Sequence, residues 1–250
     1  EQGVAWTIKT CGLDVPVFIF GCQEEEVLTP TTPRRDSFCG LLSIGEALRQ
    51  IGKKYTVART PICFPSDPDF IEDLRRFAAI SRVVTGVRAA RYGQIGARPD
   101  GFWTCRFDEK ALQRLGATTV TLDLSEAMAR NEDEDSPEVA SKIGEIKVFC
   151  DKSGVADSVI NKIAKFEIFL DQFVEEKKLD ALAIQCWTSL QQNLGICIGT
   201  SMSRLGNRGI PSACESDILG AMSMHALYLA SQSPAGLADW NNVHNDDPDV

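Results

Sequence analysis

The chain has 250 residues, with 26 Lys and Arg against 35 Asp and Glu, which gives a net charge of −9 at pH 7. This acidic balance argues against a nucleic-acid-binding protein, because neutralising phosphates requires a clustered basic face. Apolar residues make up 44% of the chain. No uncharged apolar stretch approaches the length of about 20 residues that a membrane-spanning helix requires. We therefore expect a folded protein that binds neither nucleic acid nor membrane.

Nine cysteines are scattered along the chain, and no two of them form a C-x-x-C pair. Zinc sites and disulfide frameworks show tight Cys spacing or belong to small secreted chains. We therefore predict reduced, mostly buried thiols and a cytoplasmic location. The chain starts at Glu1 without the pattern of a signal peptide, and both of its ends read like the interior of a domain. We expect an internal piece of a longer chain.

The first third of the sequence alternates strand and helix patterns. The apolar run 15–20 suits a buried strand, and residues 38–50 predict a helix that is capped by Asp36 and Ser37. Apolar residues at three- and four-residue steps predict a second helix from about residue 69 to 91. The Gly- and Arg-rich segment 91–102 then breaks the pattern, so we place the first domain boundary near it.

The middle of the chain continues the same alternation. We expect a helix over residues 108–115, a strand over 118–124 and a solvated loop or helix start in the acidic stretch 131–138. Ser158 is expected to cap a long amphipathic helix. Its inward-facing residues are predicted to be Ile160, Ile163, Phe166, Phe169, Leu170 and Phe173.

The last third contains the candidate chemistry. Strand-like runs end at Gln185 and Glu215, and a further short strand is predicted from residue 234 to Asp239. Parallel strands of a β-α-β unit end at one edge of the sheet, where open sheets bind their ligands. Two carboxylates and an amide are therefore expected to converge on one crevice. Two structural alternatives stay open: Glu215 can be an ordinary first-turn residue of the following helix, and Asp239 can start an Asx-turn.

Two motifs at these positions, PSACESDILGAMSM and LADWNNVHNDDPD, resemble the L-fucose isomerase and L-arabinose isomerase superfamily of aldose–ketose isomerases. The segments RRDSFCGLLSIGEALRQ and RAARYGQIGARPDGF are similar to the fucose-isomerase-like branch. Glu215 and Asp239 are 24 positions apart, which is the interval between the two acidic metal ligands of the family. The resemblance thus implies that both are metal ligands, and that Gln185 binds the substrate.

The resemblance also implies a fold and an activity. We expect an α/β fold with parallel sheets and flanking helices, arranged as a partial N-terminal α/β domain (1–91), a second α/β domain (92–231), both Rossmann-like, and the start of a C-terminal β-rich domain (232–250). The expected activity is metal-dependent aldose–ketose isomerisation of a pentose, a hexose or a substituted sugar through a cis-enediol. Mn²⁺ or Mg²⁺ is the expected cofactor, because carboxylates and sugar hydroxyls are hard oxygen ligands. Family members are trimers or hexamers, so self-association is expected.

The sequence leaves the third metal ligand, the role of two tryptophans and an alternative function open. The third metal ligand of the family is a His in a C-terminal domain that is mostly absent here, and His225 and His244 are weaker candidates for that role than for ordinary core or surface positions. Trp187 and Trp240 flank the expected crevice, where they either stack on a sugar face or pack in the core. A non-catalytic sugar-binding α/β module is the alternative function. The metal discriminates between the two, because a binding module needs no divalent ion at Glu215 and Asp239.

Overall fold

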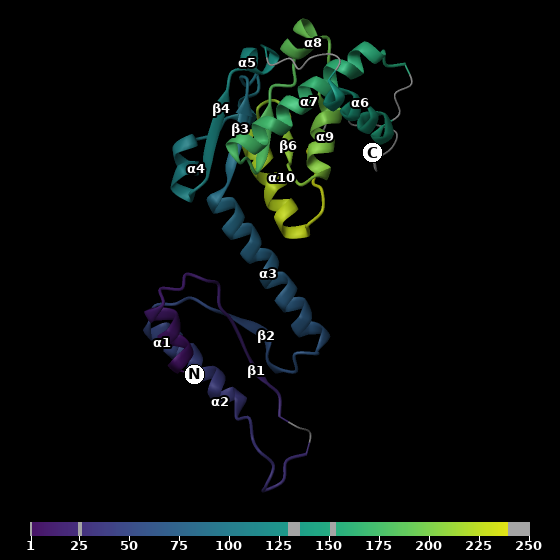
Figure 1. The fold of residues 1–250 in the computed structure, drawn as a ribbon. Coiled ribbons are helices and arrows are strands. Elements are labelled where there is room, and N and C mark those ends of the chain that lie inside the picture. Colours follow the sequence, from purple (N-terminus) through teal and green to yellow (C-terminus); the bar gives the residue numbers. More distant parts are fainter. Residues whose placement is uncertain (1, 25–26, 130–135, 151–153, 240–250) are drawn as a thin grey trace, which may run out of the picture. The chain divides into compact units, whose positions relative to one another are not determined.

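The structure is a computed structural model that describes residues 2–24, 27–129, 136–150 and 154–239. Contacts within the chain divide it into two compact units, Glu1–Arg82 (unit 1) and Val83–Val250 (unit 2). Each unit contains parallel strands with flanking helices (Figure 1). The predicted α/β fold class is therefore confirmed. No helix in the described part of the chain is both long enough and apolar enough to cross a membrane.

Unit 1 contains a two-stranded parallel sheet. Its elements are α1 (Gln2–Thr10), β1 (Phe18–Cys22), α2 (Ser37–Gln50), β2 (Thr56–Cys63) and α3 (Pro68–Ala89), of which α3 continues into the residue range of unit 2. Helix α2 is the crossover between the two strands, and it contacts α1 and β1. The predicted first strand and the two predicted helices are confirmed.

The core of unit 1 consists of two small clusters. In the first, Leu48 of α2 is fully buried beside Leu41 and Ile19. In the second, the ring centroids of Phe20 and Phe70 are 4.4 Å apart, so β1 packs against the start of α3. The short strands of this unit are thus held by a modest number of apolar side chains.

The predicted cap of α2 differs in its mechanism. Asp36 occupies the N-cap position, but its side chain makes no capping hydrogen bond. Its backbone is left-handed, with φ 51°, and its amide instead donates to Glu24 Oε1 at 2.7 Å. The turn before α2 is therefore fixed by a carboxylate from the preceding loop, which a local cap motif does not reveal.

Unit 2 contains a four-stranded parallel sheet and most of the helices. Its strands are β3 (Arg91–Ile95), β4 (Thr118–Leu122), β5 (Ala181–Ile184) and β6 (Ser212–Ala213). Its helices are η1 (Trp103–Cys105), α4 (Glu109–Leu115), α5 (Leu124–Ala129), α6 (Pro137–Phe149), α7 (Asp157–Lys177), α8 (Ser189–Asn193), α9 (Gly199–Asn207) and α10 (Ile218–Ser231). The predicted helix at 108–115 and strand at 118–124 are confirmed.

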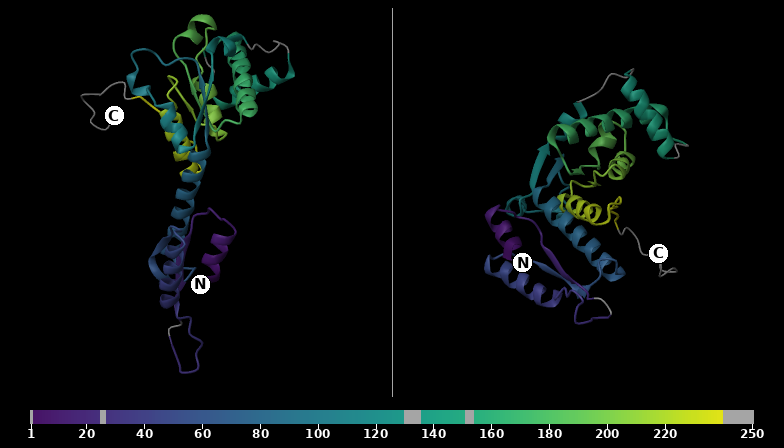
Figure 2. Two further views of the ribbon diagram at one scale, coloured as in Figure 1. Left: turned by 90° about the vertical axis from the view of Figure 1, so that its left-hand side faces the viewer. Right: turned by 60° about the horizontal axis from the view of Figure 1, so that its bottom comes forward.

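Both faces of this sheet are covered by helices. Figure 2 (left) shows α10 on one side of the sheet and α6 and α7 on the other. Alternate residues of β5 enter the two cores: Leu182 and Ile184 pack with the α7 side, whereas Ala181 and Ala183 pack with the α10 side. A strand that is buried on both faces reads as a continuous apolar run, which is why β5 is visible in the sequence.

The strand order β4-β3-β5-β6 creates a switch point. The chain moves from β3 to one neighbour, β4, and then crosses to the other side of β3 to form β5 and β6. Crossover connections leave the sheet in opposite directions at such a point, and ligands of open α/β sheets bind in the crevice outside the carboxyl ends of these strands. The fold therefore singles out the ends of β3 and β5.

Strand β3 is missed by the sequence pattern, which shows only a Gly- and Arg-rich break at residues 91–102. The strand nevertheless lies in the middle of the sheet, with β4 and β5 as its neighbours. A Cβ atom on Gly93 would lie 2.6 Å from side-chain carbons of Leu179 and of Leu182. The glycine is thus required by close packing inside the sheet, not by a turn.

Helix α7 provides the largest part of the core in unit 2. All six residues that the amphipathic pattern places inward, from Ile160 to Phe173, are buried. The predicted cap is wrong, however, because Ala156 is the N-cap residue and Ser158 lies inside the first turn.

A buried ionic network joins α7 to α6 and α9. Glu167 of α7 is completely buried, and both of its carboxylate oxygens accept hydrogen bonds from Arg204 Nε, at 2.9 and 3.1 Å. Lys142 Nζ lies 3.7 Å from the same carboxylate and donates to Asp171 at 2.8 Å. Arg208 also bonds Asp171, at 2.7 and 3.0 Å. Such a network is stable only while every charge has its partner.

Three further sequence predictions concern residues 131–138, 234–239 and the C-terminal end of the chain. Residues 234–239 form no strand, so the predicted last strand is wrong. The acidic stretch 131–138 lies largely outside the described residues, and its last part begins α6, where Ser136 Oγ accepts from Val139 N as the N-cap. The expected opening of a C-terminal domain lies mostly in residues 240–250, which are also outside the described residues.

Candidate active site

Gln185 and Glu215 lie at the carboxyl edge of the sheet in unit 2. Gln185 directly follows β5, and its backbone N–H donates a hydrogen bond to the Ile95 carbonyl at 2.8 Å. Glu215 follows β6 by two residues. Because β5 and β6 are adjacent and parallel, the two side chains belong to neighbouring loops at one edge.

The side chain of Gln185 is held at the switch point. Its Oε1 accepts a hydrogen bond from Ala97 N at 2.9 Å, and its Nε2 is 3.3 Å from Ser189 Oγ. Gly96 precedes this contact with φ 78°, and a Cβ atom there would lie 2.5 Å from Gln185 Oε1. The loops after β3 and β5 are thus joined through this amide, and only a glycine permits their close approach.

The carboxylate of Glu215 is partly buried, and its two oxygens differ. Oε1 lies 3.1 Å from Cys186 Sγ, whereas the buried Oε2 has no hydrogen-bond partner among the described residues. Burial, and after it the negative charge of Asp239, raise the pKa of Glu215. A buried carboxylate oxygen without a donor is costly unless a cation or a proton satisfies it.

The backbone at this position is unusual. Glu215 and Ser216 are consecutive non-glycine residues with left-handed φ angles of 59° and 55°. Ser216 is buried, and its amide donates to the Ile184 carbonyl at 3.2 Å while its hydroxyl donates to the Ile95 carbonyl at 3.4 Å. Ser216 therefore anchors this turn to the ends of β3 and β5. Backbone outliers of this kind concentrate at functional sites.

Asp239 is exposed and follows no strand, which corrects the expectation that it ends one. Its charge nevertheless acts on Glu215, so the two carboxylates share one electrostatic environment. The structure thus brings Gln185 and Glu215 to one edge of the sheet and sets Asp239 within electrostatic range of Glu215.

The alternative in which Glu215 is an ordinary first-turn residue of α10 is not what the structure shows. The N-cap of α10 is Asp217, whose Oδ1 accepts from Gly220 N at 2.9 Å. Glu215 lies two residues before this cap and makes no contact of the capping kind there. Its position is set by the Ser216 anchor, and its side chain is left for another role.

An aromatic loop borders the same edge. The rings of Phe102 and Trp187 are stacked, with centroids 6.3 Å apart, and Trp187 is 53% exposed. Of the two alternatives for Trp187, packing in the core is therefore excluded, whereas Trp240 lies outside the described residues. Arg98 donates hydrogen bonds to the carbonyls of Pro99 and Asp100, so its side chain stabilises the turn in which it lies. The exposed Trp187 ring is available to stack on a ligand.

The cysteines depart from the prediction of reduced, mostly buried thiols. Cys186 and Cys214 form a disulfide with their Cα atoms 5.7 Å apart. Among the seven free cysteines only Cys63 is buried. The sequence does not reveal this pairing, because the two cysteines are 28 positions apart and only the sheet makes them neighbours. Among the described residues, Cys186, Cys214 and Glu215 are the one group of at least three potential metal-ligating side chains whose ligand atoms lie within 4.8 Å of one another.

The histidines offer no third ligand in the described part of the chain. His225 is buried in α10, where its Nδ1 is 3.3 Å from the Tyr92 hydroxyl, and burial lowers its pKa. It is the core histidine that its position in an apolar helix predicts. His244 lies outside the described residues.

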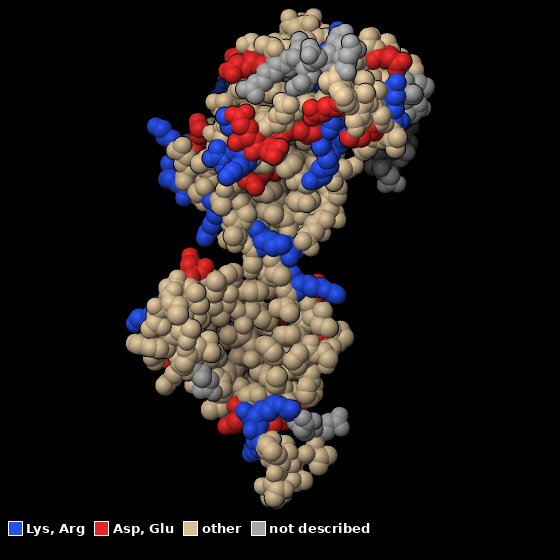
Figure 3. Space-filling model, viewed as in Figure 1, with Lys and Arg blue, Asp and Glu red and all other residues tan. Residues whose placement is uncertain are grey.

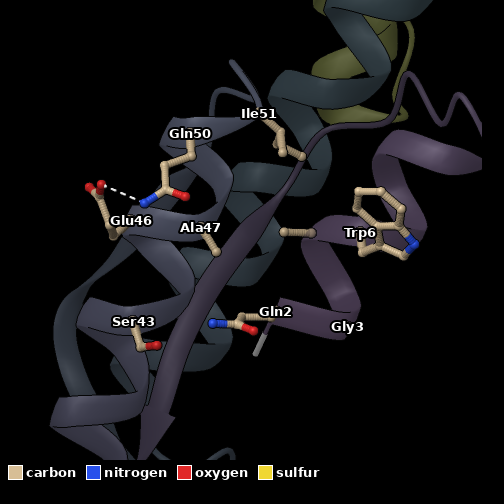
Figure 4. Close-up of a pocket in the computed structure, with 9 residues that line it drawn as sticks. Gln2, Gly3, Trp6, Ser43, Glu46, Ala47, Gln50 and Ile51 are labelled. Atoms are coloured by element: carbon tan, nitrogen blue, oxygen red, sulfur yellow. Dashed lines mark hydrogen bonds between the residues drawn. The ribbon is translucent and has the colours of Figure 1, made fainter.

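Two cavities differ in whether the loop that carries Glu215 borders them. One of about 520 Å³ lies between α1 and α2 in unit 1, beside Trp6 and Ala47 (Figure 4). Its carboxylate, Glu46, is already bonded to Arg49 and Gln50, which lower its pKa to about 2. The other, of about 440 Å³, is bordered by α9, α10, Cys214 and the segment from Pro234 to Leu237. Only the second adjoins the loop that carries Glu215.

Comparison with known proteins identifies the family of the chain. Residues 1–88 match the N-terminal domain of fucose/sulfoquinovose isomerases. The sulfoquinovose isomerase of Alkalicoccus urumqiensis is 29% identical over 229 residues, which cover 88% of this chain and 49% of the relative. That of Priestia aryabhattai is 31% identical over 189 residues, which cover 73% of this chain and 41% of the relative. This chain belongs to the fucose isomerase-like superfamily.

Membership in the fucose isomerase-like superfamily confirms the resemblance drawn from the sequence motifs. A third relative, the sulfoquinovose isomerase of Clostridium sp. (strain MSTE9), is 24% identical over 213 residues, which cover 83% of this chain and 46% of the relative. The chain thus spans about half the length of the curated relatives that it matches. These alignments extend far beyond residue 88, so the similarity also includes much of unit 2.

Proposed function

We propose that the whole protein is a divalent-metal-dependent aldose–ketose isomerase. Its substrate class is a pentose or a hexose, with a sulfonated hexose such as sulfoquinovose as the first candidate because the relatives carry that name. The observation that carries the proposal is Glu215, a carboxylate at the carboxyl edge of the sheet whose buried Oε2 has no hydrogen-bond partner among the described residues.

The residues present fit a divalent cation. Glu215 and Asp239 would hold it, and both offer hard carboxylate oxygens of the type that Mn²⁺ and Mg²⁺ prefer. Burial, followed by the charge of Asp239, raises the pKa of Glu215, and a bound cation would stabilise both carboxylates in their charged form. When bound, the ion would supply a Lewis acid that stabilises the negative charge developing on sugar oxygen while C1 and C2 exchange oxidation states.

The chain's own residues would move the proton. Isomerisation removes a proton from C2 of an aldose, passes through a cis-enediol and returns a proton to C1. In this proposal Glu215 and Asp239 would accept and return that proton, and a positioned acid–base group contributes about 10²- to 10⁴-fold to the rate. The raised pKa of Glu215 suits this work, since it brings the group closer to neutral pH.

Gln185 and Trp187 would position the sugar. The Gln185 amide is fixed at the switch point by Ala97 and Ser189, so a sugar hydroxyl would meet an oriented polar group. Trp187 presents an exposed ring beside it.

Self-association as a trimer or hexamer belongs to the same proposal. The exposed apolar side chains of Trp6, Phe38 and Leu42 in unit 1 support it, because they offer a contact surface for a second copy.

The test uses the full-length protein that contains this sequence. Aldoses, including sulfoquinovose, are incubated with Mn²⁺, and ketose formation is followed for the wild type, Glu215→Gln and Glu175→Gln. Glu175 is an exposed carboxylate of α7 and serves as the matched control. We expect Mn²⁺-dependent turnover in the wild type and in the control, and a loss of about 10²-fold or more in Glu215→Gln. Binding of a sugar without turnover or metal dependence would favour a non-catalytic sugar-binding module instead.

A further inference from the structure

The disulfide between Cys186 and Cys214 joins two loops of the candidate site. Cys214 directly follows β6 and precedes Glu215, whereas Cys186 directly follows Gln185. The Cα atoms are 5.7 Å apart, a separation typical of disulfides. Both cysteines are partly exposed, so small thiols and disulfides can reach the bond.

The sulfur of Cys186 is also a neighbour of the Glu215 carboxylate. Its Sγ lies 3.1 Å from Glu215 Oε1. In a disulfide this sulfur carries no proton, so it cannot donate to the carboxylate. In the dithiol form the Cys186 S–H can donate a hydrogen bond to Oε1, because the two atoms are already within bonding distance. The redox state of the pair therefore decides whether Oε1 receives this hydrogen bond.

We propose that Cys186 and Cys214 form a reversible dithiol–disulfide site that is coupled to Glu215. Its functional consequence rests on the proposed isomerase function, whereas the coupling itself does not. The oxidant is a low-molecular-weight disulfide such as glutathione disulfide. One Cys thiolate attacks it and releases one glutathione thiol, and the second Cys thiolate then displaces the other glutathione. Two protein thiols and one small disulfide thus give one protein disulfide and two small thiols, and two electrons pass to glutathione.

The other cysteines do not share this position. Cys105 is a free cysteine, whereas Cys186 and Cys214 are already paired with each other. Cys197 is exposed and lies 3.7 Å from Gln191 Nε2, whose amide also donates to the Cys186 carbonyl. Cys197 is thus near the pair without belonging to it, and it provides the matched control.

Coupling to Glu215 has a consequence that requires neither metal nor activity. If the S–H to carboxylate hydrogen bond stabilises the dithiol form, then weakening it favours the disulfide, by reciprocal linkage. Glu215→Gln replaces a charged acceptor by a neutral one, and hydrogen bonds to charged groups are about twice as strong as neutral ones. We expect its dithiol–disulfide equilibrium to shift on the order of tenfold toward the disulfide.

The experiment equilibrates the full-length protein, kept free of metal, in glutathione buffers from fully reduced to fully oxidised. Thiols are then blocked, and the disulfides are mapped by mass spectrometry. We expect a Cys186–Cys214 disulfide that forms and reverts, a shifted midpoint in Glu215→Gln, and an unchanged midpoint in Glu175→Gln. Cys197→Ser should keep the transition, whereas Cys214→Ser should lose it. Absence of the disulfide in oxidising buffer, or the same midpoint in Glu215→Gln, would overturn the proposal.

The same samples separate this inference from the proposed function. After addition of Mn²⁺ we expect the dithiol form to bind the ion about 10-fold more tightly than the disulfide form, because hydrogen bonds to ligating carboxylates are worth that much in metal affinity. A protein with the redox transition but without isomerase activity in either form would refute the isomerase function and retain the coupled disulfide. An active protein without the transition would do the reverse.

Discussion

The two units of this chain use the same parallel α/β arrangement with different results. In unit 1, β1 and β2 are neighbours joined by α2, so the order of the strands in the sheet is the order in the sequence. In unit 2, the chain leaves β3 toward β4 and returns on the other side of it. Only the second arrangement creates a switch point, and the candidate site residues Gln185 and Glu215 lie there. The position of the site therefore follows from strand order rather than from fold class.

The units also differ in the size of the ionic networks that they contain among the described residues. In the view of Figure 3, charged side chains gather over unit 2, whereas the surface of unit 1 is mostly uncharged above a charged group at its lower end. Unit 2 buries Glu167 in an ionic network, while the Glu46–Arg49 pair of unit 1 is exposed. Unit 1 combines small apolar clusters with the buried carboxylate of Asp73, which pairs with Arg59. Three predictions test this contrast.

The largest effect is expected at Glu167. Glu167→Ala leaves Arg204 buried without its carboxylate partner, and removing one member of a buried ion pair costs about 3–5 kcal/mol. Urea unfolding of Glu167→Ala and of the control variant Glu46→Gln measures how much each lowers the free energy of unfolding. Glu46→Gln is the control, because the Glu46–Arg49 pair is exposed to solvent and is expected to contribute little to stability. Equal losses in both variants would remove the distinction between the buried and the exposed charges.

A somewhat smaller and local effect is expected at Leu48, which is fully buried in unit 1. Leu48→Ala opens a cavity in a small cluster, and such changes cost about 2–5 kcal/mol. Hydrogen exchange followed by mass spectrometry should show the loss of protection in residues 2–82, with little change in β3 and β5. A loss of protection that is uniform over both units would show that they unfold as one.

The smallest effect concerns Glu215 and depends on pH. Because its pKa is raised by burial and by Asp239, the folded protein binds the proton more tightly than the unfolded chain. The stability that this provides is fully present below the ordinary pKa of 4.5 and is lost as the pH rises through the raised value. Gln cannot ionise, so Glu215→Gln should melt higher than the wild type at pH 7 with chelator present. The two midpoints should converge below pH 4.5. A difference that does not change with pH would contradict the buried-carboxylate account.

Much of the fold follows from local patterns, and the exceptions share a cause. Helix α7 and strand β5 are visible in the sequence because burial leaves a periodic or a continuous apolar signal. Strand β3 is missed because its Gly93 is selected by Leu179 and Leu182, which come from distant parts of the chain. The short strand predicted before Asp239 does not form, because an apolar run of this length does not by itself specify a partner strand.

The candidate site divides in the same way. Gln185 and Glu215 could be found because each follows a recognisable strand run. The Ser216 anchor, the Cys186–Cys214 disulfide and the Glu167 network could not, because each depends on residues that become neighbours only through the sheet or the helix packing. The left-handed backbone at Glu215 could not be predicted either, because left-handed positions are usually recognised by a glycine and this position has none.

Enediol chemistry at Glu215 is the activity that we propose for the carboxyl edge of unit 2. The most direct test incubates the full-length protein with Mn²⁺ and sulfoquinovose or other aldoses in D₂O, and follows deuterium at C1 and C2 by NMR. We predict ketose formation with solvent deuterium incorporated at the exchanging carbon, lost on chelation and in Glu215→Gln but retained in Glu175→Gln. Isomerisation that continues undiminished without divalent metal, or in Glu215→Gln, would contradict the claim.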